Sequence, residues 1–195
     1  ASLREMQDWR SWTSVLVNWG IVLGSMAAVA AWPNPLTVIA ALFLIGARQL
    51  GMAVLMHEAS HFSLFSDKRV NDWVASWLCA YPVWTDLYAY RHYHMGHHAR
   101  TWTKDDPDLG LANPFPVTRE SLRRKIWRDL SGQTGWKRVK YTLQRDLGLR
   151  QGKMRRTAES ARAFRGMVIT NLVLFGVLAL AGHPALYLLW VVAFL

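Results

Sequence analysis

The chain has little cysteine and little negative charge. Its one cysteine, Cys79, excludes an internal disulfide and any metal site built mainly from thiolates. The 13 acidic residues are outnumbered by 23 lysines and arginines, and they are too scattered for the carboxylate-rich metal sites of soluble helix bundles. No nucleic-acid-binding fold is recognisable, and the basic residues adjoin long apolar segments. We therefore expect no nucleic-acid partner.

Two apolar segments lie in the first third of the chain. Residues 12–32 carry no charge and, at 1.5 Å per residue, reach about 30 Å, the thickness of a bilayer's hydrocarbon core. Residues 36–56 have the same length and contain Arg48, whose charge we expect to be paired inside a helix bundle. Joined by the turn WPNP, the two segments predict a transmembrane helical hairpin over residues 12–56.

A second apolar pair lies at the end of the chain and predicts another transmembrane hairpin, over residues 167–195. Leu195 falls inside an apolar run without a stop signal, so we expect the chain to be C-terminally truncated. Between the hairpins, residues 57–166 are mostly polar. They include WVASWLCAYPVW, residues 73–84, which is too short to span and predicts an interfacial or re-entrant helix. The predicted fold is one all-α integral membrane domain over residues 1–195.

The excess positive charge is confined to one segment. Residues 119–165 hold fifteen Lys and Arg against four Asp and Glu. By the positive-inside rule, this segment and the rest of residues 57–166 face the cytoplasm. Within it, SLRRKIWRDL places Leu122, Ile126 and Leu130 at helical spacing. Its charged face either lies on anionic lipid or is simply solvated.

Six of the seven histidines fall within 42 residues, in two groups. HEASH places His57 and His61 at i, i+4, which makes them neighbours on one helical face. HMGHH places His94, His97 and His98 at i, i+3, i+4, again on one face. His92 lies off that face, and His183 lies in a turn on the opposite side of the membrane, so we interpret both as non-ligands. Five imidazoles at helical spacing beside apolar spans indicate a metal site.

The residues alone leave the metal open. H-E-x-x-H on a helix is the zinc-peptidase motif, in which Glu58 would act as base and one later residue would complete the ligands. The second group, however, offers three histidines where zinc needs one. Five imidazoles suit two metal ions, and imidazole accepts zinc, copper, iron and nickel alike.

HEASH, followed by HMGHH and then by TWTKDDPD, resembles the histidine boxes of the integral-membrane fatty acid desaturase family, and the resemblance covers nearly the whole chain. It implies an O2-activating centre of two non-haem iron ions at the cytoplasmic end of a helical bundle. It also implies desaturation of the acyl chain of a membrane lipid. By the same resemblance, five histidines are metal ligands: His57, His61, His94, His97 and His98. The family's third box, of H-x-x-H-H type, is absent, so we expect this fragment alone neither to bind two irons nor to turn over.

Further expectations concern the surroundings of the metal. The second ring nitrogens of the ligands need partners, for which the acidic candidates are Glu58, Asp105, Asp106 and Asp108. The residues Trp73, Trp77 and Trp84 are candidates to line an acyl channel. No flavin, haem or iron–sulfur motif is present, so electrons must come from an external donor, a ferredoxin or a small haem protein, which the basic face would steer. The alternatives are hydroxylation or ketolation of a lipid, sterol or carotenoid on the same scaffold, a membrane zinc protease, and a non-catalytic membrane or metal-binding protein.

Overall fold

A computed structural model describes residues 6–146 and 158–195. Within these ranges the chain is helical and contains no strand, as the sequence predicts. Part of the predicted cytoplasmic region, residues 147–157, lies outside the described residues. The elements, in chain order, are α1 (Asp8–Ala31), α2 (Pro35–Ser60), α3 (Lys68–Val74), η2 (Ala75–Ala80), η3 (Tyr81–Val83), α4 (Leu87–Arg100), α5 (Leu109–Ala112), α6 (Arg119–Leu130), α7 (Gln133–Asp146), α8 (Ala158–Leu180), η4 (Pro184–Leu186) and α9 (Tyr187–Phe194).

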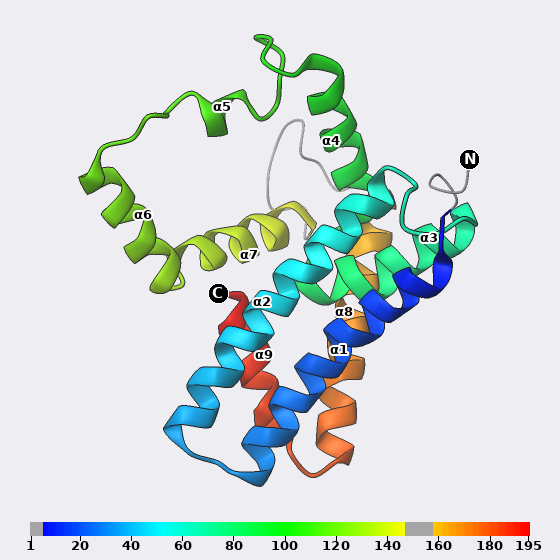
Figure 1. Ribbon diagram of the computed structural model, residues 1–195, viewed down its shortest axis with the longest axis vertical. Coiled ribbons are helices and arrows are strands. Elements are labelled where there is room, and N and C mark those ends of the chain that lie inside the picture. Colours follow the sequence, from blue (N-terminus) through cyan, green and yellow to red (C-terminus); the bar gives the residue numbers. More distant parts are fainter. Residues whose placement is uncertain (1–5, 147–157) are drawn as a thin grey trace.

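Helices α1 and α2 lie side by side, joined by the short turn that the sequence predicts (Figure 1). The turn ends at Asn34, whose side-chain oxygen accepts hydrogen bonds from the backbone N–H groups of Leu36 and Thr37 at 3.0 and 3.1 Å. Pro35 occupies the first helical position, where its missing N–H costs nothing. This cap fixes where α2 begins, 26 residues before the end that carries the first histidines.

Among the described helices, three are long and apolar enough to cross a membrane: α1, α2 and α8. The return helix of the second predicted hairpin, α9, is shorter and packs against α2 (Figure 1). Gln49 of α2 is buried and donates to the backbone carbonyl of Trp190 at 2.9 Å. The Trp190 ring stacks on Trp19 of α1 with 5.7 Å between centroids. These contacts join the first two spans to the last helix.

The stretch predicted to be interfacial or re-entrant is a broken helix, not a span, and most of it is buried between α2 and α8. Pro82 has no N–H, so the carbonyl of Leu78 one turn earlier lacks its α-helical partner. The indole N–H of Trp19 donates to that carbonyl at 2.9 Å instead. Asn171 of α8 donates to the carbonyls of Tyr81 and Pro82 at 3.4 and 3.3 Å. Irregular backbone is tolerated at membrane depth only when it is satisfied by protein in this way.

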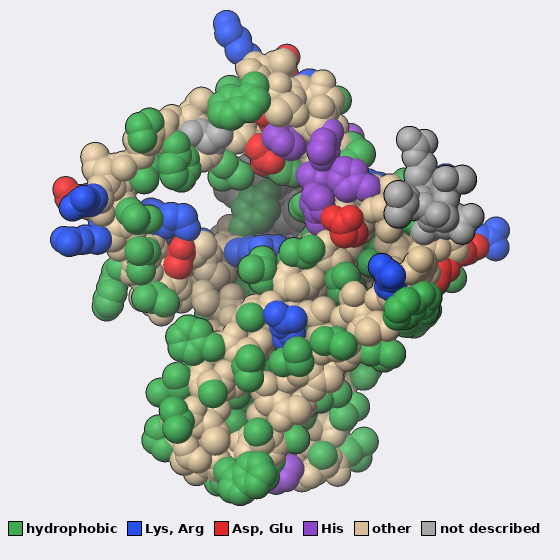
Figure 2. Space-filling model, in the orientation of Figure 1, with side chains coloured by type: hydrophobic (Ala, Val, Ile, Leu, Met, Phe, Trp, Pro, Cys, Tyr) green, Lys and Arg blue, Asp and Glu red, His purple; other side chains and the backbone are tan. Residues whose placement is uncertain are grey.

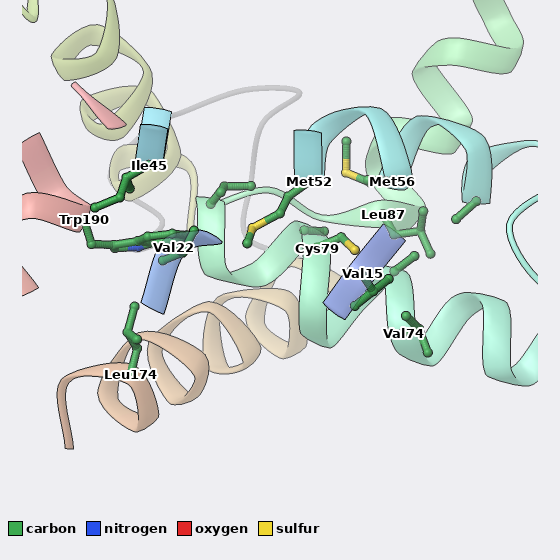
Figure 3. Close-up of a cluster of buried hydrophobic side chains, with 14 of the residues drawn as sticks. Val15, Val22, Ile45, Met52, Met56, Val74, Cys79, Leu87, Leu174 and Trp190 are labelled. Carbon is green, nitrogen blue, oxygen red and sulfur yellow. The ribbon is translucent and has the colours of Figure 1, made fainter. Parts of the chain in front are cut away.

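Gly166 allows α8 to approach this broken helix closely. A Cβ added at Gly166 would collide with the ring of Tyr81, which is nearly fully buried. The hydrophobic core lies where α1, α2, η2, α8 and α9 meet, and Figure 3 shows Val22, Met52 and Trp190 within it. Cys79 is fully buried there, and burial raises the pKa of its thiol to about 12. The thiol is therefore an apolar packing group.

Arg48 does not behave as expected. It forms no ion pair with any residue in the two described ranges, although pairing inside the bundle was the sequence-based expectation. Its side chain is half-buried on α2. Beyond α4, the elements α5 and α6 form an arm that extends away from the spans, and α7 lies back beside them, where Arg138 donates to the hydroxyl of Thr85 (Figure 1). The helix predicted from SLRRKIWRDL is present as α6, and its apolar residues Leu122, Ile126 and Leu130 are exposed.

Candidate metal centre

The end of α2 carries the first two histidines. His57 lies in the last turn of the helix, and His61 is the residue that caps it. Their ring centroids are 5.0 Å apart, as the i, i+4 spacing predicts. The Nδ1 atom of His57 is 3.0 Å from the carboxylate of Glu58, which also accepts a hydrogen bond from Ser63 at 3.3 Å. Glu58 therefore holds one nitrogen of His57 and leaves Nε2 available to a metal.

Helix α4 carries the second group. It begins after Asp86, whose carboxylate accepts the backbone N–H of Ala89 at 3.1 Å. Of the three histidines on this helix, His94 is buried, whereas His97 is partly buried and His98 is exposed. The phenol ring of Tyr90, one turn before His94, stacks on its imidazole with 5.3 Å between centroids.

The two groups meet. The Nε2 atom of His94 lies 2.9 Å from Nε2 of His61 and 3.0 Å from Nε2 of His98. The ring of His57 is 4.5 Å from that of His94, centroid to centroid. One ligand atom from each of His57, His61 and His94 falls within 4.8 Å of the others, so these three residues are positioned to hold a metal ion. Figure 2 shows the histidines gathered in one patch at the end of the apolar helices, beside acidic side chains.

The charge state of the cluster suits metal binding. Burial and then the neighbouring imidazoles, His57 first, lower the pKa of His94 to about 4. Burial also lowers the pKa of His61, and the proximity of His57 and His98 adds to this shift. Both rings are therefore neutral at pH 7 and present lone pairs, which a cation would satisfy.

His97 occupies the edge of the cluster. Its ring centroid is 6.3 Å from that of His94, and its Nδ1 atom is 2.7 Å from the buried carboxylate of Asp106. Asp106 is itself fixed by the backbone N–H groups of Trp102 and Asp108, each at 2.9 Å. The hydrogen bond to Asp106 raises the pKa of His97, although the loss of hydration opposes it, and the same bond lowers the pKa of Asp106. Asp106 thus sets the orientation of His97.

Arg91 joins the two histidine-bearing helices, and sequence reasoning missed it. Its guanidinium donates to the backbone carbonyls of Ser60 and Ala59, at 3.0 and 2.9 Å, in the last turn of α2. It also forms a two-pronged ion pair with Asp72 of α3. Its plane lies 3.9 Å from the ring centroid of Phe62, which follows the last residue of the first box. The only sequence signal was its place three residues before His94.

The other two histidines and one of the acidic candidates lie outside the cluster. His92 is exposed and makes no contact with the cluster, and His183 lies at the opposite end of the spans beside Leu186 and Ala181. Asp105 is exposed and contacts no histidine, unlike the other three acidic candidates. Asp108 lies 3.5 Å from His97 and accepts a short hydrogen bond from the Tyr93 hydroxyl, which raises the pKa of Tyr93 to about 12.

Comparison with known proteins decides the class to which this site belongs. The sequence model of a family described as fatty acid desaturase matches residues 33–195, which is most of the chain and includes all five histidines. The chain belongs to the fatty acid desaturase family. A dihydrorhizobitoxine desaturase from Bradyrhizobium elkanii is 30% identical over 121 residues, covering 58% of this chain and 33% of that protein. The chain thus spans about a third of the length of the curated relative that it matches. No solved structure matches it.

Membership of the desaturase family and the three apolar helices both agree with a membrane protein. Family membership also favours the interpretation of H-E-x-x-H as a histidine box over a zinc-peptidase motif. A zinc peptidase needs one further ligand besides His57 and His61, whereas two more imidazoles lie beside His61. Nε2 of His94 is 2.9 Å from its Nε2, and the ring of His98 is 4.9 Å away, centroid to centroid. In addition, Glu58 is engaged with His57.

Proposed function

We propose that this chain functions in the membrane as an oxidoreductase that uses O2 to introduce a double bond into a fatty acyl chain of a lipid. Family membership supports the reaction class. The single observation that carries the proposal is the convergence of imidazoles from α2 and α4 at the end of apolar helices. A saturated acyl chain has no activated hydrogens, so no side chain has the driving force to remove them. A metal centre at the end of the apolar helices would supply this driving force close to the acyl chains of the bilayer.

The proposed cofactor is a pair of non-haem iron ions, held by five histidines: His57, His61, His94, His97 and His98. The donor set fits this assignment, because all are imidazoles, two are neutral at pH 7, and four have ring centroids within about 5 Å of a neighbour. When bound, iron would supply the oxidising power for hydrogen removal, with O2 as co-substrate. The protein's own residues orient the ligands: Glu58 holds His57 and Asp106 holds His97.

The proposed substrate is a membrane lipid or its acyl chain, and the proposed electron source is an external ferredoxin or small haem protein. Positive charge supports the second proposal, because the described part of the arm carries exposed cations on α6, including Arg123, Lys125 and Arg128. An acidic carrier would be steered towards such a surface. We also propose that the histidine end of the spans faces the cytoplasm, on the basis of the positive-inside rule.

The test is expression of the complete gene in a host whose membrane lipids are profiled, with metal analysis of the purified product. We expect iron to exceed zinc and new double bonds to appear. The variants His57→Ala and His94→Ala should each abolish both, whereas His92→Ala should retain both because His92 lies outside the cluster.

Three other outcomes would overturn parts of the proposal. A hydroxyl or keto product in place of a double bond would assign the sibling reaction on the same scaffold. One zinc per chain, with peptide cleavage that is lost in Glu58→Gln, would assign a protease. Iron binding that survives His94→Ala would show that the two helices do not share the metal.

A further inference from the structure

Two adjoining cavities lie away from the histidines. The first, which we call the basic pocket, has a volume of about 580 Å³, and its lining includes Lys68, Arg69, Asp72, Trp73, Trp77 and Arg162. The second, the apolar groove, has a volume of about 360 Å³, and its lining includes Trp19, Trp73, Trp77, Ile169, Val173 and Val177. Trp73 and Trp77 line both, so the two cavities adjoin at these indole rings. None of the five proposed metal ligands lines either.

The basic pocket carries unneutralised positive charge. Lys68, Arg69 and Arg162 form no ion pair with any residue of the described ranges. Asp72, the one acidic residue of the lining, is already neutralised by its two-pronged pair with Arg91. Burial would raise the pKa of Asp72, but hydrogen bonds from Arg91 and Asn71 outweigh this and lower it. The pocket therefore attracts an anion.

The apolar groove runs along two helices that can span a membrane, α1 and α8. Its α8 residues, from Ile169 to Val177, lie seven to fifteen positions beyond Arg162. At 1.5 Å per residue this places the groove about 10–22 Å below the guanidinium. One leaflet contributes about 15 Å of hydrocarbon, so the groove has the depth of a lipid tail whose head group is level with Arg162.

The pocket lies at the end of the spans where a lipid head group would be. Ser66, two residues before Lys68, donates from its backbone N–H to the Asp8 carboxylate at 2.9 Å, and Asp8 begins α1. Arg162 lies near the first residue of α8. Two tryptophans at the junction, Trp73 and Trp77, are the residues that prefer the interface between head groups and hydrocarbon.

We propose that the basic pocket and the apolar groove together bind one anionic phospholipid of the surrounding bilayer. Lys68, Arg69 and Arg162 surround its phosphate, Trp73 and Trp77 flank its glycerol region, and one acyl chain lies in the groove between α1 and α8. This site requires no metal, so it is independent of the proposed desaturation.

The test of the charge uses native mass spectrometry of the intact protein in neutral detergent, titrated with phosphatidylglycerol or with phosphatidylcholine. We expect one tightly bound phosphatidylglycerol per chain and weaker binding of phosphatidylcholine. The triple variant Lys68→Gln, Arg69→Gln, Arg162→Gln should lose on the order of a hundredfold in affinity, because each basic residue near an anionic lipid contributes about fivefold. The matched control replaces Arg123, Lys125 and Arg128 of α6 by Gln and should change the affinity less than threefold. Equal losses in the two triple variants, or equal binding of the two lipids, would overturn the proposal.

A second experiment tests whether an acyl chain lies in the apolar groove, by comparing two neighbouring positions on α8. Val173 lines the groove and Leu172 does not, although their exposed fractions are similar, 59% and 62%. Val173→Trp should fill the groove and weaken phosphatidylglycerol binding at least tenfold, whereas Leu172→Trp should leave it unchanged. Unaltered helix content in both variants confirms that each still folds. If inorganic phosphate displaces the lipid at equal concentration and Val173→Trp has no effect, the site binds free phosphate and not a lipid.

Discussion

The two helices that supply the histidines deliver them to one place but are held there by different forces. Helix α2 is an apolar helix whose last turns bury Met52, Met56 and Ala59 in the hydrophobic core. Helix α4 buries only Leu87 and His94. Its position depends on polar contacts, chiefly the Arg91 guanidinium at one end and the Asp106 carboxylate at the other. The first box is therefore placed by burial, and the second is placed by hydrogen bonds and ion pairs. Substitutions that remove these polar side chains should therefore disturb the second box more than the first.

The largest expected effect follows from removing the residue at which the two groups meet. His94→Ala should weaken Co²⁺ or Fe²⁺ binding by more than 100-fold, which exceeds the roughly 10–100-fold cost of losing an outer partner. Isothermal titration of the purified protein measures this affinity. His92→Ala, two residues away on the same helix, is the control and should bind metal normally. Similar affinities in the two variants would mean that α4 contributes no central ligand.

The second-largest effect is expected from removing Arg91, the residue that connects α4 to the end of α2. Arg91→Ala leaves the Ser60 carbonyl without its donor and removes the cation that pairs with the mostly buried Asp72, so the free energy of unfolding should fall by about 2–3 kcal/mol. Metal affinity should fall with it, because α4 is no longer fixed to α2. Thermal unfolding of the metal-free protein measures the first effect. Arg100→Ala, at the exposed end of α4, should alter the midpoint by less than about 1 °C. A stable Arg91→Ala with normal metal affinity would contradict the role of polar contacts.

A smaller effect is expected at the outer end of α4. Asp106→Asn keeps the size of the side chain but removes the charge that orients His97, so metal affinity should fall about tenfold. Asp105→Asn is the matched control, because Asp105 is adjacent, exposed and without a histidine contact. An equal loss of metal affinity in both variants would show that the negative charge near the site matters, and not the orientation of His97.

The smallest expected effect is the dependence of the protein's stability on pH. The pKa of His94 is about 4 in the folded protein and about 6.5 when unfolded, so between these values the unfolded chain binds more protons. Stability of the metal-free protein should therefore fall as the pH is lowered from 7 to 6, by about 0.7 kcal/mol or roughly 1–3 °C in the midpoint. His94→Asn should reduce this dependence. A midpoint that rises on acidification would contradict the burial of a neutral imidazole.

Much of this arrangement could be predicted from the sequence, and the residues show why. The lengths of the apolar segments predict α1 and α2, since about 20 apolar residues match a bilayer. The i, i+4 spacing predicts which histidines share a helical face. The convergence of the two boxes was also predicted, because a cluster of imidazoles beside apolar spans needs a common partner. These inferences depend only on local periodicity and composition.

What could not be predicted depends on contacts between distant residues. Arg91 reads as one more basic residue, and only the fold shows that it reaches the carbonyls that end α2. Pro82 marks a break in a helix, but the indole of Trp19 that satisfies the freed carbonyl lies 59 positions from its acceptor residue. Arg48 was expected to be paired, yet the described residues give it no ion pair. Pairings of this kind are set by packing, which a single sequence does not encode locally.

The most direct test is X-ray absorption at the iron edge of iron-loaded protein, comparing the unaltered chain with His57→Ala and with His94→Ala. If imidazoles of α2 and α4 share the metal, the spectrum shows several imidazole nitrogens around iron, and each variant loses part of that signal. A spectrum without imidazole scattering, or one that changes when only one of the two helices is altered, would contradict the shared site.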